Sequence, residues 1–477
     1  MKTQNWFLKQ ADLNPTRLAV TDGREALTFA QLATRVQDLA GHLAAVSHGP
    51  RVGLLTKNKL LGYQLALAIM GLGKTIVWLN WRLASEELAW QVEDSALDLV
   101  LVDDDLWRAD FDDRYRSFSQ LLAQPAAPRK LVAEFDHEAV ASIMYTSGTT
   151  GRPKGVLQTF GNHYASAIAS SLNLGLVAGE EWLCVTPLFH ISGFSIVMRG
   201  LVYGMPVRLM DHFDAAAVTQ VLAEEPVTII SAVPYMLKQL LKVRQAGGPA
   251  FNPHFRLVLL GGGTIDRASL TASQAAGFQV VQCYGMTETC SQVIALSAAD
   301  AAAQLGAVGK PLFTTRLKLL EESGEVAIKT PALSPGYLNQ PEKMAAKMRD
   351  GWYLTGDIGH LNDAGFLFID GRKDEMIISG GENIFPQEVE QAFLQAPGVA
   401  AIAVVGVPDD TWGARPVAFV VGTRQSEQAL IDYGYAHLAH YKVPRHFFFV
   451  DQLPTNAAGK LQRFKLRELA AAKLSQI

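Results

Sequence analysis

Short apolar runs that end in glycine or polar residues recur along the chain and restrict the folds open to it. Three of them cover residues 227–231, 257–263 and 280–285. Such runs are typical of buried parallel strands that feed a loop at their carboxyl ends. Between them, residues 215–225 and 235–246 have apolar side chains at helical spacing. The alternation predicts a doubly wound α/β body, with functional loops gathered at the strand ends.

The pattern changes after Asp370. The later segments predict a small α+β module, with helices over 386–396 and 427–440 and strands near 400–405, 417–421 and 447–450. At 477 residues the chain is too long for one ordinary core. We therefore expect a large N-terminal domain over residues 1–370 and a small, mobile C-terminal domain over 371–477, with a hinge in the polar segment between them.

Charge and cysteine content exclude several classes of function. The 42 Lys and Arg residues do not exceed the 46 Asp and Glu residues, so no positive surface for nucleic acid is expected. The three cysteines lack CxxC spacing, which argues against a disulfide framework or a zinc site. The N-terminus has no secretion signal. The longest apolar stretch, residues 65–79, is interrupted by Gly71, Gly73 and Lys74 and falls short of the ~20 apolar residues of a membrane span. We expect a cytoplasmic protein that acts on small molecules.

A loop over residues 145–155 has the composition of a phosphate-binding loop. It combines hydroxyls, glycines and Lys154 directly after the strand-like run 139–144. Glycines let backbone N–H groups approach phosphate oxygens, while hydroxyls and a lysine add hydrogen bonds and charge. The spacing does not match the Walker A loop. A Ser/Thr/Gly-rich surface turn is the alternative.

A second segment, residues 284–289, offers an aromatic ring, a glycine bend, a hydroxyl and a carboxylate close together. A nucleotide needs these groups, although Glu288 could instead stabilise a helix N-terminus. The two segments resemble motifs of the adenylate-forming superfamily, which contains acyl-CoA synthetases, luciferases and the adenylation domains of peptide synthetases. Further family motifs follow in order at residues 355–357, 371–374, 380–384 and 454–460. The resemblance extends from about Phe29 to Lys460.

The resemblance implies ATP, Mg²⁺ and CoA as ligands. The residues expected to bind the nucleotide are Thr146, Ser147, Gly148, Thr149, Thr150, Gly151, Lys154, Gly262, Tyr284, Asp357 and Arg372. Thr287 is expected near the α-phosphate, and Glu288 is expected to bind Mg²⁺, which prefers oxygen ligands. Asp357 and Arg372 could instead form a plain interdomain ion pair.

The resemblance also assigns roles to the C-terminal segment. Asp374 is implied as the hinge residue, and Gly380 and Gly381 as part of the loop that enters the site for the CoA step. Lys460 is implied as the catalytic lysine that bridges the reacting carboxylate and the α-phosphate. A cation aimed at that negative charge lowers the barrier. A solvated lysine near a chain end is the alternative.

Residues 187–194 resemble the acyl-site motif of the family. His190 is implied as a gate that could donate to the acid or stabilise its charge, and Gly262 as part of the floor under the acyl group. Arg199 lies in an apolar segment, where a cation needs an anionic partner, and Ser291 is expected to hydrogen-bond the acid. Two alternatives remain open: His190 could be a core histidine, and Arg199 could reach solvent or pair with Asp or Glu.

Residues 158–164 and 286–292 are similar to the 2-succinylbenzoate:CoA ligases of menaquinone (vitamin K2) biosynthesis. Their substrate has a second carboxylate, which would give Arg199 a purpose. The resemblance therefore implies an AMP-forming acid:CoA ligase. The alternatives are another aryl- or fatty-acyl-CoA ligase, an adenylation module that loads a carrier protein, and a binding protein of the same fold without chemistry. The sequence does not determine the oligomeric state, and a homo-oligomer is possible.

Overall fold

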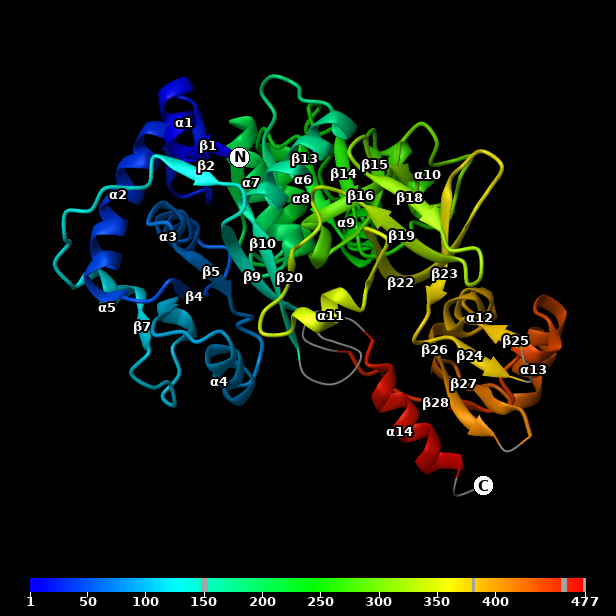
Figure 1. Cartoon of the computed structure of the whole chain (residues 1–477). Helices are drawn as coiled ribbons and strands as arrows, with labels where there is room; N and C mark the ends of the chain where they lie inside the picture. Colours follow the sequence, from blue (N-terminus) through cyan, green and yellow to red (C-terminus); the bar gives the residue numbers. More distant parts are fainter. Residues whose placement is uncertain (147–152, 380–381, 410, 456–460, 475–477) are drawn as a thin grey trace. The chain divides into compact units, whose positions relative to one another are not determined.

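A computed structural model of the protein describes residues 1–146, 153–379, 382–409, 411–455 and 461–474 (Figure 1). The chain forms two units. Unit 1 contains Met1–Leu317, Ile328–Tyr353 and Asp363–Leu367, and unit 2 contains Lys318–Ala327, Leu354–Asn362 and Phe368–Ile477. Two segments that precede residue 370 thus belong to unit 2, and the single boundary at 370/371 stays a prediction.

A seven-stranded sheet forms one half of unit 1, in the order β20-β10-β9-β5-β4-β6-β7. Its strands are β4 (Arg51–Leu55), β5 (Thr75–Trp78), β6 (Val100–Val102), β7 (Tyr115–Ser117), β9 (Val140–Thr146), β10 (Lys154–Thr159) and β20 (Gly336–Tyr337). Strands β9, β5, β4, β6 and β7 are parallel, whereas β10 runs antiparallel to both β9 and β20.

A nine-stranded sheet forms the other half, in the order β17-β16-β15-β14-β13-β11-β12-β2-β3. Its strands are β2 (Leu18–Thr21), β3 (Ala26–Thr28), β11 (Trp182–Cys184), β12 (Val207–Leu209), β13 (Ile229–Ala232), β14 (Leu257–Leu260), β15 (Gln279–Met286), β16 (Ser291–Leu296) and β17 (Lys310–Pro311). The three apolar runs near 227, 257 and 280 are β13, β14 and β15, which pair in parallel as predicted. The predicted α/β class is confirmed, but the body divides between two large sheets.

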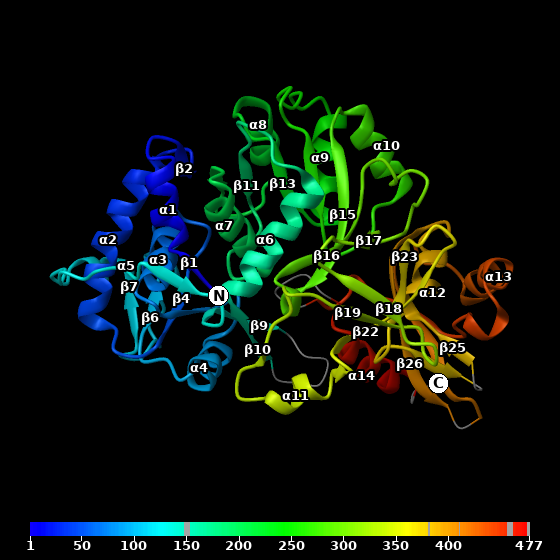
Figure 2. The same ribbon diagram turned by 45° about the horizontal axis from the view of Figure 1, so that its top comes forward.

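Helices surround these sheets (Figures 1 and 2). They are α1 (Trp6–Leu13), α2 (Phe29–Val46), α3 (Leu60–Gly71), α4 (Ser85–Asp94), α5 (Phe118–Leu122), α6 (Phe160–Leu174), α7 (Ile191–Tyr203), α8 (Ala215–Glu224), α9 (Pro234–Gln245), α10 (Arg267–Ala275) and α11 (Pro341–Ala345). Helix α3 is buried on nearly every side, so the apolar stretch 65–79 belongs to the core. Helix α6 contacts β10 of one sheet and β16 of the other. It is therefore well placed to link the two sheets.

Four further strands, β18 (Arg316–Leu319), β19 (Glu325–Lys329), β22 (Trp352–Leu361) and β21 (Met348–Arg349), lie side by side, and β23 (Leu367–Arg372) pairs with β22. Strands β1 (Lys2–Gln4) and β8 (Glu134–Asp136) form a separate antiparallel pair. Among the residues that the structure describes, no helix combines the length and apolar character needed to cross a membrane.

The C-terminal part of unit 2 is the predicted α+β module. A three-stranded sheet contains β26 (Val399–Asp409), β27 (Gly413–Gly422) and β28 (Phe447–Phe449), and a short hairpin contains β24 (Ile377–Ser379) and β25 (Glu382–Ile384). Its helices are α12 (Pro386–Phe393), α13 (Glu427–His437) and α14 (Arg463–Leu474). Phe393, Val404 and Phe447 pack in one core cluster of this module.

Candidate functional site

The ends of the predicted phosphate loop are held together as a hairpin. Thr146 ends β9 and lies opposite Lys154, which begins β10. The Tyr145 hydroxyl donates to Asp94 Oδ2 at 2.7 Å, which fixes the last residues of β9 to helix α4. Predicted loop residues Ser147, Gly148, Thr149, Thr150 and Gly151 lie outside the described residues.

Strand β15 extends through Met286 and contains Tyr284. A 3₁₀ turn over Thr287–Thr289 follows and returns the chain into β16. A Cβ atom on Gly285 would lie 2.0 Å from the Ser291 carbonyl oxygen, so this position requires glycine. The tight return brings the predicted residues Thr287, Glu288 and Ser291 into one turn.

Tyr337 connects the phosphate loop with this turn. Its hydroxyl donates to Glu288 Oε1 at 2.8 Å, and Lys154 Nζ lies 5.5 Å from the centroid of its ring. Tyr337 was not among the predicted site residues, because no local motif distinguishes it from the other tyrosines of the chain. The structure thus brings the predicted residues Lys154 and Glu288 to the same tyrosine.

Glu288 suits the predicted magnesium ion. Among the described residues there is no group of three or more His, Cys, Asp or Glu side chains that could form a protein cage around a metal. Mg²⁺ is usually bound by one or two carboxylates together with waters and substrate phosphates. A single carboxylate held by Tyr337, whose ring Lys154 also approaches, fits that mode of binding.

Arg199 is buried in helix α7 with only 1% of its surface exposed. Its Nη2 donates to Ser291 Oγ at 3.1 Å, whereas its Nε has no partner among the described residues. Burial lowers the pKa of the guanidinium. No described Asp or Glu forms an ion pair with it. Arg199 therefore neither reaches solvent nor pairs with a described carboxylate.

Arg199 lies beside the glycine run that follows β14. Burial raises the pKa of the Cys283 thiol to about 12, although the positive charge of Arg199 opposes this. A Cβ atom on Gly261 would lie 3.4 Å from Cys283 Sγ. Gly262, the next residue, is exposed and has a φ of +78°. The cation, the thiol and the glycine run are thus neighbours behind the turn that contains Glu288.

His190 precedes helix α7 and lies at the end of this helix opposite to Tyr203. Its Nε2 is buried without a hydrogen-bond partner among the described residues. Burial and the nearby Arg82 lower the pKa of His190 to about 4. The ring is therefore neutral near pH 7 and keeps an unused nitrogen, unlike a core histidine with satisfied hydrogen bonds.

The predicted ribose residues belong to unit 2. Arg372 Nη1 donates to Asp357 Oδ1 at 2.7 Å and to the Thr355 carbonyl at 3.3 Å. The ion pair that the sequence left as an alternative is therefore present, within one unit, and a role toward ribose stays a prediction. Asp374 is exposed in the turn after β23, while Gly380, Gly381 and Lys460 lie outside the described residues.

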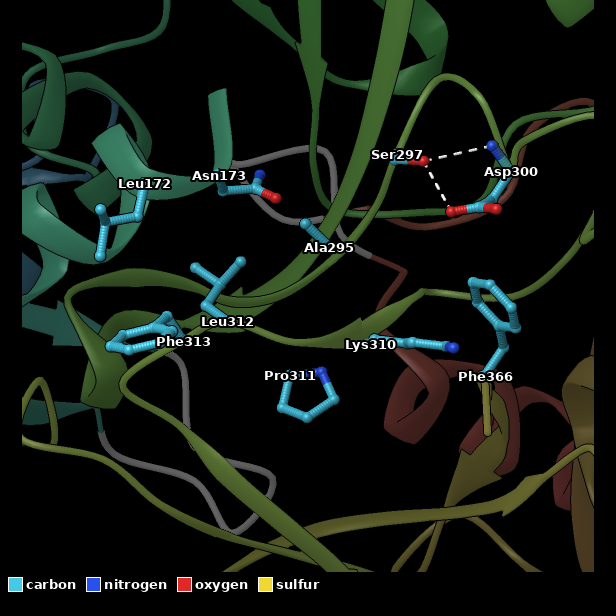
Figure 3. Close-up of a pocket in the computed structure, with 10 residues that line it drawn as sticks. All are labelled: Leu172, Asn173, Ala295, Ser297, Asp300, Lys310, Pro311, Leu312, Phe313 and Phe366. Carbon is cyan, nitrogen blue, oxygen red and sulfur yellow. Dashed lines mark hydrogen bonds between the residues drawn. The ribbon is translucent and has the colours of Figure 1, made fainter. Parts of the chain in front are cut away.

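A separate cavity of about 240 Å³ opens on unit 1. Its lining includes Leu172 and Phe313, as well as Lys310, whose Nζ lies 4.4 Å from the centroid of the Phe366 ring (Figure 3). None of the predicted site residues lines this cavity. It is therefore distinct from the group formed by Lys154, Glu288 and Arg199.

Comparisons with known proteins agree with this geometry. The family model of the AMP-binding enzymes matches residues 7–338, and that of the AMP-binding enzyme C-terminal domain matches residues 388–460. The 2-succinylbenzoate–CoA ligase of Geobacillus kaustophilus is 44% identical over 479 residues, which cover 98% of this chain and 97% of that protein.

Two solved structures of the o-succinylbenzoate CoA synthetase from Bacillus subtilis are also similar. The complex with the acyl-adenylate intermediate OSB-AMP has a TM-score of 0.92 at 38% identity, with 98% of each chain covered. The complex with ATP and a magnesium ion has a TM-score of 0.91 at 38% identity and covers 98% of this chain and 100% of that chain.

Proposed function

We propose, from the premise that this chain belongs to the AMP-binding enzyme family, that it converts 2-succinylbenzoate to 2-succinylbenzoyl-CoA in menaquinone biosynthesis. It is an AMP-forming acid–CoA ligase, which uses ATP, Mg²⁺ and CoA. The buried guanidinium of Arg199 is the observation in this chain that favours a substrate with two carboxylates.

A dicarboxylic acid explains why a cation is buried at this position. One carboxylate reacts, while the other keeps its charge inside the pocket. A buried charge is costly unless an opposite charge and hydrogen bonds accompany it. Arg199 Nε has no partner among the described residues, and a substrate carboxylate would supply one. Ser291, which accepts from Arg199, would orient the guanidinium.

In the first half-reaction a carboxylate oxygen attacks the α-phosphorus of ATP, and pyrophosphate leaves. We assign Lys154 and Thr287 to the phosphates, and Glu288 to Mg²⁺, which neutralises phosphate charge when bound. Lys460 would stabilise the charge that develops between the carboxylate and the α-phosphate. Tyr337 would fix Glu288 through the hydrogen bond to its Oε1.

In the second half-reaction the sulfur of CoA attacks the acyl carbon, AMP leaves, and the thiol proton is released. We propose that unit 2 turns about Asp374 between the two steps, so that the segment with Gly380 and Gly381 serves the thioester step. Different conformations would then serve adenylation and thioester formation. His190, neutral near pH 7, would contact the acid without adding charge.

The test is an assay with the purified full-length protein, MgATP and CoA. The acids compared are 2-succinylbenzoate, benzoate and a medium-chain fatty acid, with pyrophosphate and thioester measured separately. A strong preference for 2-succinylbenzoate supports the proposal. Turnover with the other acids alone would keep the ligase and reject this substrate. We further propose that the enzyme works in the cytoplasm, where CoA and ATP are available.

A further inference from the structure

Helix α6 passes between the two large sheets (Figure 2), and one face of it carries polar side chains. Asn162, His163, Ser166 and Ser170 are all buried there. Ser166 Oγ donates to the Cys290 carbonyl at 2.6 Å, and Ser170 Oγ accepts from the Gln292 side chain at 3.1 Å. The polar face therefore binds the chain segment that directly follows Glu288.

His163 begins a chain of hydrogen bonds that crosses from this helix to the turn itself. Its Nε2 lies 2.9 Å from Ser142 Oγ, and Ser142 Oγ donates to Gln158 Oε1 at 2.8 Å. Gln158 Nε2 then donates to the Thr287 carbonyl at 2.9 Å. His163, Ser142 and Gln158 are 2% exposed or less. We call these three side chains the relay.

The direction of every hydrogen bond in the relay is fixed by its last acceptor. The Thr287 carbonyl can only accept, so the amide nitrogen of Gln158 must face it and the amide oxygen must face Ser142. The single hydroxyl proton of Ser142 is then used on Gln158. Ser142 Oγ can only accept from His163, so His163 carries its proton on Nε2. Burial and Arg199 lower the pKa of His163 to about 3, which agrees with a neutral ring.

The relay anchors one side of the residue pair Thr287–Glu288. The other side is anchored by the Ser334 backbone N–H, which donates to the Glu288 carbonyl at 2.7 Å. Both carbonyls of the pair are thus bound to residues outside the turn. With its backbone held on both sides, the turn has little freedom to move the Thr287 and Glu288 side chains.

We propose that the relay is a positioning device that aims Thr287 and Glu288 at the nucleotide phosphates and their metal ion. This inference rests on the roles proposed above for those two residues. In this proposal the relay residues act through the Thr287 carbonyl and not through contact with substrate or metal. Their effect is to hold the turn in the geometry that adenylation requires, since misplacement of reacting groups by about 1 Å can slow a reaction about 100-fold.

The test compares two nearly isosteric substitutions, His163→Gln and His163→Met, in the full-length enzyme. The glutamine amide can donate to Ser142 near the position of Nε2, whereas methionine cannot. We expect His163→Met and Gln158→Met to lower kcat for pyrophosphate release on the order of 10–100-fold, with little change in KM for the acid. His163→Gln should restore most of the rate.

Ser273→Ala is the matched control. Ser273 is fully buried, and its hydroxyl donates to the Ser269 carbonyl at 2.8 Å within helix α10. Loss of the Ser273 hydroxyl also removes a buried hydrogen bond, but one that is distant in sequence from the relay residues. We expect lower thermal stability without the loss in kcat. Equal rate losses in His163→Gln and His163→Met would mean that the ring only fills space, and would overturn the relay.

Two measurements on the free protein need no turnover. Nitrogen NMR of histidine side chains should find His163 protonated on Nε2, and a proton on Nδ1 instead would overturn the assigned direction. Amide exchange at Ser334, which donates to the Glu288 carbonyl, should be faster in His163→Met than in wild type or Ser273→Ala. Unchanged exchange would also overturn the inference. Failure of the wild-type enzyme to activate any acid would refute the proposed function but leave these two results decisive for the relay.

Discussion

Replacement of Arg199 by methionine should raise the stability of the free protein while it removes the preference for a dicarboxylic acid. Methionine fills a similar volume without charge. In the free protein, Arg199 is buried with one hydrogen bond to Ser291 and an Nε without a described partner. Removal of such a charge relieves a desolvation penalty. Removal of the same charge from the substrate complex leaves a carboxylate buried alone.

The magnitudes of the stability change and of the loss in kcat/KM can both be estimated. Replacing a buried ion pair by apolar groups of similar volume is often neutral or stabilising by about 1–4 kcal/mol, and we expect a gain of this order for a buried cation without a described anion. Leaving a buried partner charge unpaired is unfavourable by about 3–5 kcal/mol. At about 1.4 kcal/mol for each factor of ten, the latter predicts a loss of roughly 100-fold to 4,000-fold in kcat/KM for 2-succinylbenzoate. Benzoate has no second carboxylate, so its kcat/KM should change far less.

Arg208→Met is the matched control. Arg208 is also buried in unit 1, but its Nη2 donates to Glu225 Oε1 at 2.7 Å. Its removal should destabilise the protein and leave the acid preference intact. The assays are thermal unfolding without ligands and kcat/KM for each acid. A destabilised Arg199→Met protein, or parallel losses with both acids, would refute the argument that Arg199 is a cation kept for a substrate carboxylate.

Three further predictions concern other parts of the molecule. Lys460→Ala should abolish pyrophosphate release yet still form thioester from supplied acyl-adenylate and CoA; equal loss of both steps would contradict separate conformations. Arg463→Met should destabilise unit 2 by about 3–5 kcal/mol in urea unfolding, because the Arg463 side chain is only 10% exposed and donates to Glu375 and Glu390, whereas Arg467→Met at an exposed position should have little effect. The pKa of His163 is about 3 when folded, below its ordinary 6.5, so the unfolded chain binds the extra proton and stability falls as the pH falls below about 6.5. The decrease from pH 7 to pH 5 should be smaller in His163→Gln by about 2 kcal/mol, and an identical pH dependence would show that the ring is not buried in its neutral form.

The elements predicted from periodicity were those that local spacing determines. The helix expected over 215–225 is α8, Ala215–Glu224, and the module after residue 386 has the predicted order of helices and strands. The division of the body into two large sheets was not predicted. Strand β2, Leu18–Thr21, pairs with β12, Val207–Leu209, and such distant pairing is not encoded in the periodicity of either segment. The sequence therefore predicted which segments form helices and strands better than it predicted which strands pair with each other.

The same limit applies to the site. The turn with Thr287 and Glu288 was found because its residues are consecutive, and Arg199 because a cation interrupts an apolar segment. Tyr337 was missed because it reaches Glu288 from a position 49 residues later. The three relay residues lie on two strands and a helix. The segment that contains Gln158 and His163 was noticed only for its similarity to known ligases. No spacing rule connects either residue to Thr287.

The turn after Glu288 joins the residue that we propose for Mg²⁺ to the residues that we propose for the acid. Cys290 and Ser291 have φ values of 49° and 102°, a conformation that costs residues other than glycine on the order of 1–3 kcal/mol each. The Cys290 carbonyl accepts from Ser166, and the Ser291 carbonyl accepts from Thr289 Oγ1 at 2.7 Å. Glycine would relieve the strain at 291 but would remove the hydroxyl that accepts from Arg199. One strained turn thus joins Glu288 to Ser291, the partner of the Arg199 guanidinium, so we expect a displacement of either side chain to shift the other.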